Sequence, residues 1–173
     1  MVEETITDPS RIAALLRAEI EGLTDPPFES MTVEAASGEP GTPTFRVTDA
    51  EGTVLTATEG PERLAVEVRR DPEAVAAAAQ AVGLLARPTA TDPPATVLLI
   101  ERAADVKRVI DVLRACSTIV TALDRGARAV MPVLDMAQAG KIASNLDPDV
   151  YRLGGERGGE KIEGYHLGNS PQE

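Results

Sequence analysis

The chain has 173 residues and a formal net charge of −11; 43% of its residues are hydrophobic and only 2% are aromatic. This length suits one ordinary domain or two small ones, with a core built from Ala, Val, Leu and Ile. The apolar runs are too short to span a bilayer, the acidic N-terminus is unlike a secretory signal, and a single cysteine excludes an internal disulfide and a multi-cysteine zinc site. We therefore expect a cytoplasmic protein that binds neither membranes nor nucleic acid.

The charge is unevenly distributed along the chain. Residues 1–94 hold 17 acidic and 7 basic side chains, whereas residues 95–173 hold 11 acidic and 10 basic ones. The acidic first part repels polyanions, while the nearly neutral second part leaves room for an anionic ligand next to its arginines. A composition rich in acidic residues and poor in lysine resembles that of halophilic proteins, which indicates a habitat and not an activity.

The first part of the chain predicts a small α+β domain. Asp8-Pro9 and Asp71-Pro72 each favour a helix start, because Asp caps free N–H groups and Pro suits the first turn. Alternating apolar residues between these helices predict strands, including a hairpin about the turn at residues 49–52, and Thr96–Ile100 is typical of a buried strand. The expected order is α-β-β-β-α-β, with residues 87–94 as a linker. This pattern resembles a family of uncharacterised acidic haloarchaeal proteins, which implies no activity.

The second part of the chain predicts alternating helices and strands. Ser117–Leu123 favours a helix that Gly126 ends, and Ala129–Val133 favours a short strand. Asp135 is expected to cap a helix through about Leu146, and Val150–Leu153 to form another strand. Such alternation predicts α/β layering, with ligands bound beyond the strand ends.

Residues 153–171, LGGERGGEKIEGYHLGNSP, place six glycines within 19 positions. Glycine loses more backbone entropy on folding than any other residue, so a structural loop seldom uses it so densely. A loop around an anion would use it, because bare backbone N–H groups can then approach the ligand closely. From these residues alone, the stretch is either an anion-binding loop or a flexible C-terminal tail.

This stretch, taken with IDVLRACSTIVTALDRGARAVMPV at residues 110–133, resembles the 2-phosphosulfolactate phosphatase family over about residues 109–173. The resemblance implies Mg²⁺-dependent removal of phosphate from 2-phospho-3-sulfolactate, a small phosphorylated and sulfonated anion, in coenzyme M biosynthesis. It also implies that the family continues beyond GNSP with elements that complete the pocket. We therefore expect the activity to be reduced or lost by truncation.

The resemblance assigns roles to ten residues. It implies catalytic roles for Asp111, Arg114, Glu156 and Arg157, and substrate binding by Gly154, Gly155, Gly158, Gly159, Asn169 and Ser170. Asp111 and Glu156 offer hard oxygen ligands that suit Mg²⁺. Arg114 and Arg157 offer planar guanidinium groups that bind oxyanions through two hydrogen bonds. Which carboxylate acts as a base and which as a metal ligand stays open.

Simpler interpretations compete with these roles. Asp111 alone is typical of a helix cap or an exposed ion pair, and Glu156-Arg157 of a solvated turn. Lys161 is expected in solvent. His166 stands where the resemblance leads us to expect Asp, and as the single histidine it favours a polar surface role over catalysis.

The lone Cys116 is best interpreted as a small packing residue near a helix start. A cysteine phosphatase places an arginine six residues after its nucleophile to hold the phosphate, and this chain has Ala122 at that position. Cys116 is therefore not expected to act as a nucleophile.

We divide the chain into a small acidic α+β domain over residues 1–115 and a partial phosphatase-like α/β segment over residues 109–173, so the overall class is α/β. The two parts make opposite demands on the shared residues 109–115, since the first needs a helix there and the second a strand. Apolar residues at helical spacing favour a helix over Ala103–Ala115. This helix would displace Asp111 and Arg114 from the geometry that the resemblance implies.

Two functions follow from this division. The first is a phosphatase of a small phosphorylated sulfonate, inactive if truncation removes its pocket. The alternative is a non-enzymatic acidic binding or interaction domain that carries a phosphatase fragment. A natural fusion, an engineered chimera and a wrongly joined gene each produce such a chain, and a homo-oligomer stays open.

Overall fold

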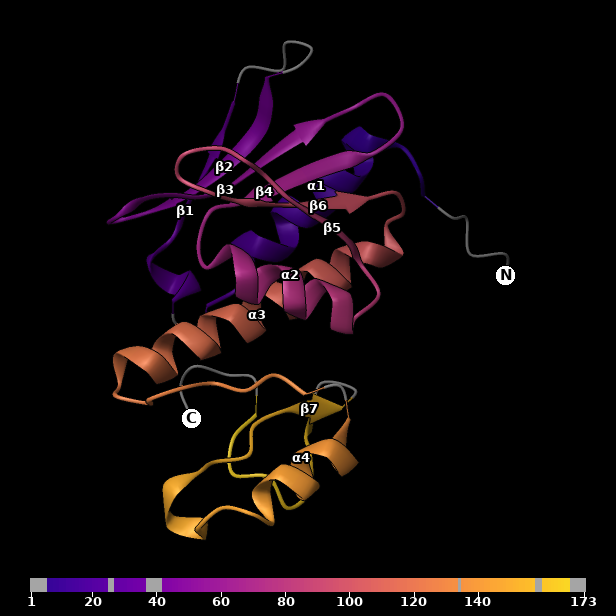
Figure 1. Cartoon of the computed structure of the whole chain (residues 1–173). Coiled ribbons are helices and arrows are strands. Elements are labelled where there is room, and N and C mark those ends of the chain that lie inside the picture. The colour runs from indigo at the N-terminus through magenta and orange to yellow at the C-terminus, as the bar shows by residue number, and fades with distance from the viewer. Residues whose placement is uncertain (1–5, 25–26, 37–41, 134, 158–159, 169–173) are drawn as a thin grey trace.

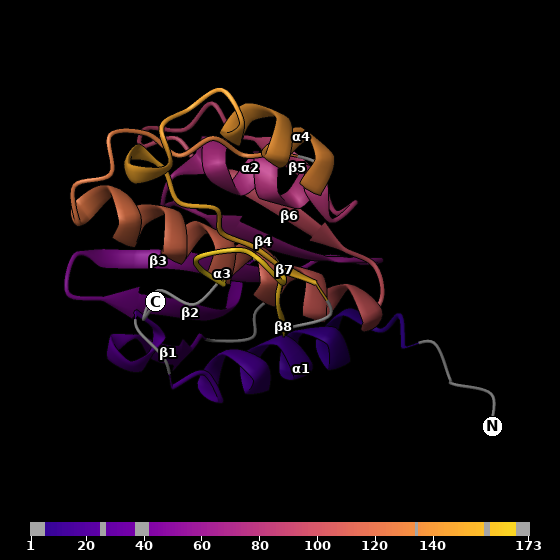
Figure 2. The ribbon, with the colours of Figure 1, turned by 90° about the horizontal axis from the view of Figure 1, so that it is seen from below.

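The computed structural model describes residues 6–24, 27–36, 42–133, 135–157 and 160–168. It is a mixed α/β structure in which a six-stranded sheet carries helices on one face (Figure 1). Three helices form that layer: α1 (Pro9–Glu21), α2 (Pro72–Ala81) and α3 (Ala104–Asp124). Seen from below, α1, α3 and α2 lie side by side in front of the strands (Figure 2), and α3 contacts both of its neighbours.

The sheet is antiparallel throughout, with strand order β1-β2-β3-β4-β6-β5. Its strands are β1 (Thr32–Ala35), β2 (Pro43–Asp49), β3 (Gly52–Glu59), β4 (Leu64–Val68), β5 (Leu85–Pro88) and β6 (Thr96–Ile100). A short 3-10 helix, η1 (Phe28–Ser30), precedes β1. The hairpin of β2 and β3 turns at the predicted position, where Gly52 has a φ of 120° that favours glycine.

The helix starts follow from the predicted caps. The Asp8 carboxylate accepts a hydrogen bond of 2.9 Å from the Arg11 N–H, and the Asp71 carboxylate accepts one of 3.2 Å from the Ala74 N–H. Each bond satisfies an amide that has no partner within the helix. The expected starts of α1 and α2 are confirmed.

The core lies between the sheet and the three helices. Alternate residues of β4 and β6 are buried, as expected for strands with one covered face. The one polar side chain among them, Thr96, donates a 2.7 Å hydrogen bond to the Pro72 carbonyl, so its burial leaves the hydroxyl satisfied. The core cluster of described residues reaches along the chain as far as Cys116 on α3.

The first part of the chain contains more strands than the expected order α-β-β-β-α-β. Four strands, not three, separate α1 from α2, because the hairpin contributes both β2 and β3. Residues 85–88, partly assigned to a linker, form β5 because they pair with β6 in antiparallel register. The proline and threonine residues of this stretch favoured a linker, so its short edge strand was not predicted.

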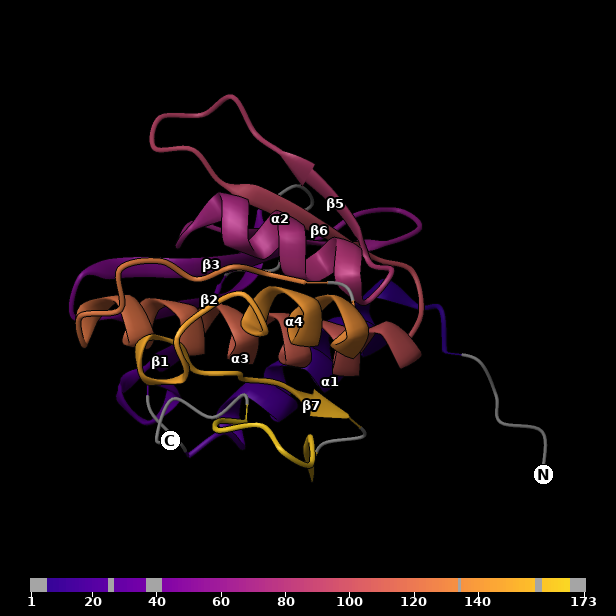
Figure 3. The ribbon, with the colours of Figure 1, turned by 60° about the horizontal axis from the view of Figure 1, so that its bottom comes forward.

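The second part of the chain corrects the expectation of α/β layering. Residues 129–133 and 150–153 form no strand, because neither has a neighbouring strand that could satisfy its backbone groups. The elements that do form are α4 (Met136–Ala143), the 3-10 helix η2 (Pro148–Val150), and the two-residue strands β7 (Glu156–Arg157) and β8 (Glu160–Lys161). Figures 1 and 3 show this segment on the outer side of the helix layer, away from the sheet.

The expected helices over residues 103–115 and 117–123 are one continuous helix, α3. It ends near Gly126, whose φ of 97° suits a glycine after a helix terminus. Cys116 therefore lies in the middle of a helix and not near a helix start. Among the described helices, none has the length and apolar character needed to cross a bilayer.

Candidate functional site

The first motif lies on α3, and its apolar residues belong to the core. Val109, Val112, Leu113 and Cys116 are each no more than 7% exposed. Their spacing of three or four residues puts them on one side of the helix, which packs toward the sheet. The packing of the α+β domain therefore determines where the polar residues of this motif point.

Asp111 forms an ion pair within its own helix. Both of its carboxylate oxygens accept hydrogen bonds from the Lys107 ammonium, at 3.0 and 3.1 Å. The two side chains are 41% and 75% exposed, so solvent screens the pair. An exposed ion pair is the simpler of the interpretations considered for Asp111.

Arg114 follows Asp111 at a spacing of three residues, which makes the two side chains neighbours on the helix surface. Arg114 is partly buried, and its carbonyl accepts a 3.0 Å hydrogen bond from the Thr118 hydroxyl. The helix thus brings a carboxylate and a guanidinium group together by position alone.

The second motif folds back on itself between residues 153 and 167. The Leu153 carbonyl accepts hydrogen bonds from the N–H groups of both His166 and Leu167, and the Gly155 N–H donates to the Leu167 carbonyl at 3.0 Å. Gly154 and Leu167 also form a parallel bridge. These bonds close the described part of the glycine-rich stretch into a compact loop, in place of a flexible tail.

This loop gives Gly155 a structural role. Its φ is 154°, and a Cβ atom there would lie 3.4 Å from the Ile162 side chain and 3.6 Å from the Tyr165 ring. Its N–H is already bound within the loop and so does not face outward to an anion. The predicted anion-binding role of Gly155 therefore has a competing explanation in the loop's own packing.

The charged pair of the motif lies on β7. Glu156 is half-buried and Arg157 exposed, and their cross-strand neighbours on β8 are Lys161 and Glu160 respectively. Opposite charges across an antiparallel pair stabilise it modestly. Lys161 is exposed, as its sequence context indicated. Gly158, Gly159, Asn169 and Ser170 lie outside the described residues.

His166 helps to close the loop. Its Nδ1 accepts a 2.9 Å hydrogen bond from the Leu153 N–H, and its ring meets Tyr151 edge-on at 6.1 Å between centroids. Accepting at Nδ1 requires that this nitrogen carry no proton, as in the neutral Nε2–H tautomer. A carboxylate would accept the same bond, which gives a physical reason why His is compatible with a position where Asp was expected.

Cys116 has the properties of a packing residue. It is 7% exposed, and burial together with the charge of Asp71 raises the pKa of its thiol to about 12. The thiolate is the reactive form of cysteine, so this thiol is inert at neutral pH.

The described residues do not bring the two expected Mg²⁺ ligands into one cluster of metal-binding side chains. Within the ranges that the structure describes, His, Cys, Asp and Glu form no cluster of three or more with metal-binding geometry. Of the two expected ligands, Asp111 already binds Lys107 on α3, and Glu156 lies on the separate hairpin β7-β8. No reaction step is therefore assigned to a metal here.

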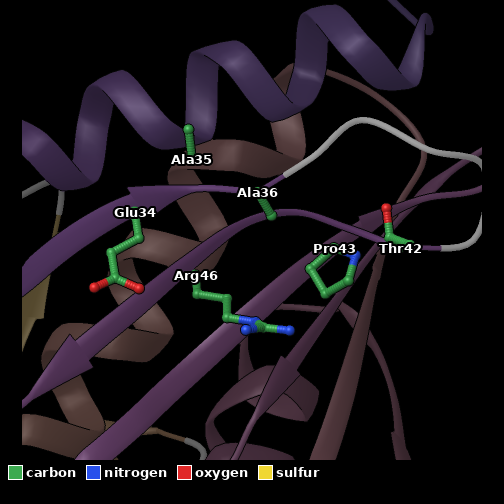
Figure 4. Close-up of a pocket in the computed structure, with 6 residues that line it drawn as sticks. All are labelled: Glu34, Ala35, Ala36, Thr42, Pro43 and Arg46. Carbon is green, nitrogen blue, oxygen red and sulfur yellow. The ribbon is translucent and has the colours of Figure 1, made fainter.

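A surface hollow that the sequence did not indicate lies at the far end of the sheet, between β1 and β2 (Figure 4). It has a volume of about 290 Å³ and is lined by Glu34, Ala35, Ala36, Thr42, Pro43 and Arg46. Glu34 and Arg46 are cross-strand neighbours. Glu34 and Arg46 alternate along their strands with inward-facing apolar residues. This pattern predicts that both are exposed, but it indicates no particular chemistry.

Comparison with known families confirms both resemblances. The family described as 2-phosphosulpholactate phosphatase matches residues 95–173, and a family of unknown function, DUF7993, matches residues 1–129. The two matches overlap over residues 95–129, a range that contains β6 and α3. The phosphatase match thus starts upstream of residue 109, where the motif was expected to begin.

Individual relatives each match less than half of the chain. A probable 2-phosphosulfolactate phosphatase of Caldanaerobacter subterraneus subsp. tengcongensis is 51% identical over 65 residues, 38% of this chain and 27% of that protein. The protein of the same name from Clostridium beijerinckii is 52% identical over the same shares. That of Clostridium novyi is 46% identical over 82 residues, 42% of this chain and 34% of the relative. The chain thus spans about a third or less of these relatives, and no solved structure matches it significantly.

Proposed function

We propose that this chain, which belongs to the family of unknown function DUF7993 through residues 1–129, is a non-catalytic acidic interaction domain that carries a phosphatase-derived segment. The observation that carries the proposal is the continuity of α3 through the first phosphatase motif. The same helix closes the core of the α+β domain. A catalytic rearrangement of the motif would therefore disrupt the domain.

The free energy needed to take residues 109–115 out of the helix supports the proposal. Exposing a buried Val or Leu side chain costs about 1.5–3 kcal/mol. Val109, Val112 and Leu113 would all become exposed if residues 109–115 left the helix. Their sum approaches the whole stability of an ordinary domain, about 5–15 kcal/mol. The helix is consequently the stable state of this stretch.

The second motif supports the same conclusion. Hydrogen bonds within the loop use the Gly155 N–H and the Nδ1 of His166. The Asp111 carboxylate is bound to Lys107. Two of the groups to which the resemblance assigns phosphate chemistry, the Gly155 N–H and the Asp111 carboxylate, thus have internal partners.

The direct test is phosphate release from 2-phosphosulfolactate by the purified chain, with and without Mg²⁺. We expect no release above that of a matched Asp111→Asn variant, with both proteins folded by circular dichroism. Mg²⁺-dependent release that the variant loses would contradict the proposal.

Limited proteolysis tests the division of the chain independently. We expect early cleavage in the exposed stretch 125–133 and a stable product that retains α3. Protection of residues 125–168 equal to that of the sheet would favour a single functional unit. In this proposal we put the boundary after α3, because one helix spans residue 115.

The second candidate function is the phosphatase itself. It is favoured by identities of 46–52% to proteins named probable 2-phosphosulfolactate phosphatases. On this alternative the substrate is a small phosphorylated sulfonate, Arg114 and Arg157 bind its oxyanions, and activity depends on Mg²⁺ as the family resemblance implies. Replacement of Arg157 by Ala would then abolish release without loss of folding.

A further inference from the structure

The face of the sheet opposite the helices carries an ordered patch at β4, β6 and β5. The register puts Glu67, Val97 and Arg87 in one row across these strands, and Ala65, Leu99 and Leu85 in the next. Leu85 is 49% exposed, Arg87 is exposed, and the other four side chains are partly exposed. We call these six residues the open-face patch. In Figure 2 all three helices of the layer lie on the other side of the strands.

The patch is complementary to itself. Rotation by 180° about an axis that is parallel to the strands and lies between the two sheets, directly over β6, places β4 of one copy over β5 of the other. Glu67 then faces Arg87 of the second copy, and the same pair recurs on the other side of the axis. Val97 and Leu99 each face their own counterparts, and Ala65 faces Leu85. In such a two-fold interface each contact away from the axis occurs twice, and a residue on the axis meets its own counterpart once.

We propose that the open-face patch is the interface of a homodimer formed by face-to-face packing of two sheets. Two sheets packed in this way lie about 10 Å apart, and their strands stay within about 30° of parallel. An apolar centre flanked by opposite charges is the arrangement that excludes water while fixing the register of the partner. This inference concerns the α+β domain and does not depend on the fate of the phosphatase segment.

Two features favour this packing over side-by-side strand pairing. The edge strand β5 ends in Arg87-Pro88, and proline has no N–H to donate to an incoming strand. The other edge strand, β1, has only four residues and presents the exposed Glu34. Short, charged or proline-containing edges hinder the addition of another strand.

The existing contacts of Glu67 are compatible with the dimer. Its carboxylate accepts a 2.9 Å hydrogen bond from Nε of Arg69, the residue that follows β4, and the side chain remains 31% exposed. Arg87 of the second copy would add another cation beside it. Two chains of net charge −11 repel each other, so association should be measured at high salt, which screens this long-range repulsion.

The test is sedimentation equilibrium of the full chain over a range of concentrations at high salt. We expect a reversible dimer, weakened at least tenfold by Glu67→Arg and by Arg87→Glu, since each puts like charges opposite each other. The double variant Glu67→Arg with Arg87→Glu restores the opposite charges and should recover the dimer. Arg46→Glu, exposed on the same face but on β2, is the matched control and should leave association unchanged.

A second variant keeps the test decisive if a charge reversal fails to fold. Leu85→Ser changes a side chain that is already half exposed, so the fold should persist by circular dichroism while the dimer weakens. A wild-type chain that stays monomeric at every concentration overturns the proposal. So does a double variant that folds but does not recover the dimer, or a control that weakens it as much as the patch variants do.

Discussion

The two parts of this molecule, residues 6–124 and residues 125–168, use the same local devices with different results. In the first part they yield a six-stranded sheet under three helices, with a closed core. In the second they yield the eight-residue helix α4, the short 3-10 helix η2 and a hairpin of two two-residue strands. Large apolar side chains stay exposed in the second part, among them Met131 at 68% and Val150 at 72%. Local sequence signals start helices and strands in both parts. These elements become long only where other elements pack against them.

Helix caps show this contrast most directly. Asp8 caps α1 and Asp135 caps α4 in the same way: the carboxylate accepts a hydrogen bond from the backbone N–H three residues later. The bond lengths are 2.9 and 2.8 Å, so the local chemistry is equivalent. The first helix buries Ile12, Leu16 and Ile20 in the core, whereas the second buries only two alanines.

Replacing an apolar side chain by alanine should give the largest difference between the two parts in the free energy of unfolding that is lost. Phe45→Ala removes a ring that is 1% exposed and should lower the free energy of unfolding by about 3–5 kcal/mol. Ile142→Ala, in the half-buried face of α4, should lower it by less than about 1 kcal/mol. Urea denaturation followed by circular dichroism measures both. Equal losses would mean that the second part belongs to the same cooperative unit.

The pH dependence of stability tests whether the Cys116 thiol is buried and unreactive. Its folded pKa of about 12 lies above the ordinary value of 9.0, so the folded state holds the proton more tightly than the unfolded state does. The resulting stabilisation is fully present below about pH 9 and is lost as the pH rises toward 12. We expect wild type to lose more stability over this range than Cys116→Ala, because titrations of the other groups cancel in the difference.

The same residue gives a check at neutral pH. Iodoacetamide should label the thiol only after unfolding in urea, since the native thiol is buried and protonated. Rapid labelling of the folded chain would indicate that α3 opens around Cys116.

The smallest effects are expected from the matched caps. Asp8→Ala and Asp135→Ala each remove one cap, worth about 1 kcal/mol. The first should lower global stability, since α1 is part of the core. The second should only increase amide exchange within α4, as measured by NMR. A global effect of Asp135→Ala would show that the two parts unfold together.

The sequence permitted prediction of features that depend on neighbours along the chain. The starts at Asp8-Pro9 and Asp71-Pro72, the turn at residues 49–52 and the helix over residues 103–115 all rest on local chemistry. Strand β5 escaped prediction because its partner β6 lies across a proline-rich connection. The strands predicted at residues 129–133 and 150–153 were wrong. Val150 ends the 3-10 helix η2, and the backbone of Leu153 bonds to His166 and Leu167 within the loop.

The same distinction applies to the candidate site: features set by neighbours along the chain could be predicted, and those set by the folded structure could not. The family resemblance rests on two long motifs, and those could be recognised from the sequence. The ion pair of Asp111 follows from the spacing of four residues to Lys107 and could have been foreseen. The role of Gly155 could not, because it depends on the φ of 154° that this residue adopts in the folded loop.

The continuity of α3 also sets the direction in which everything after it leaves the domain. Each helical residue advances the chain by about 1.5 Å and turns it by about 100°. Deletion of one residue between Cys116 and Asp124 would therefore rotate the whole segment 125–168 by more than a quarter turn while leaving the core unchanged. The number of residues in α3 therefore determines how segment 125–168 is oriented relative to the core.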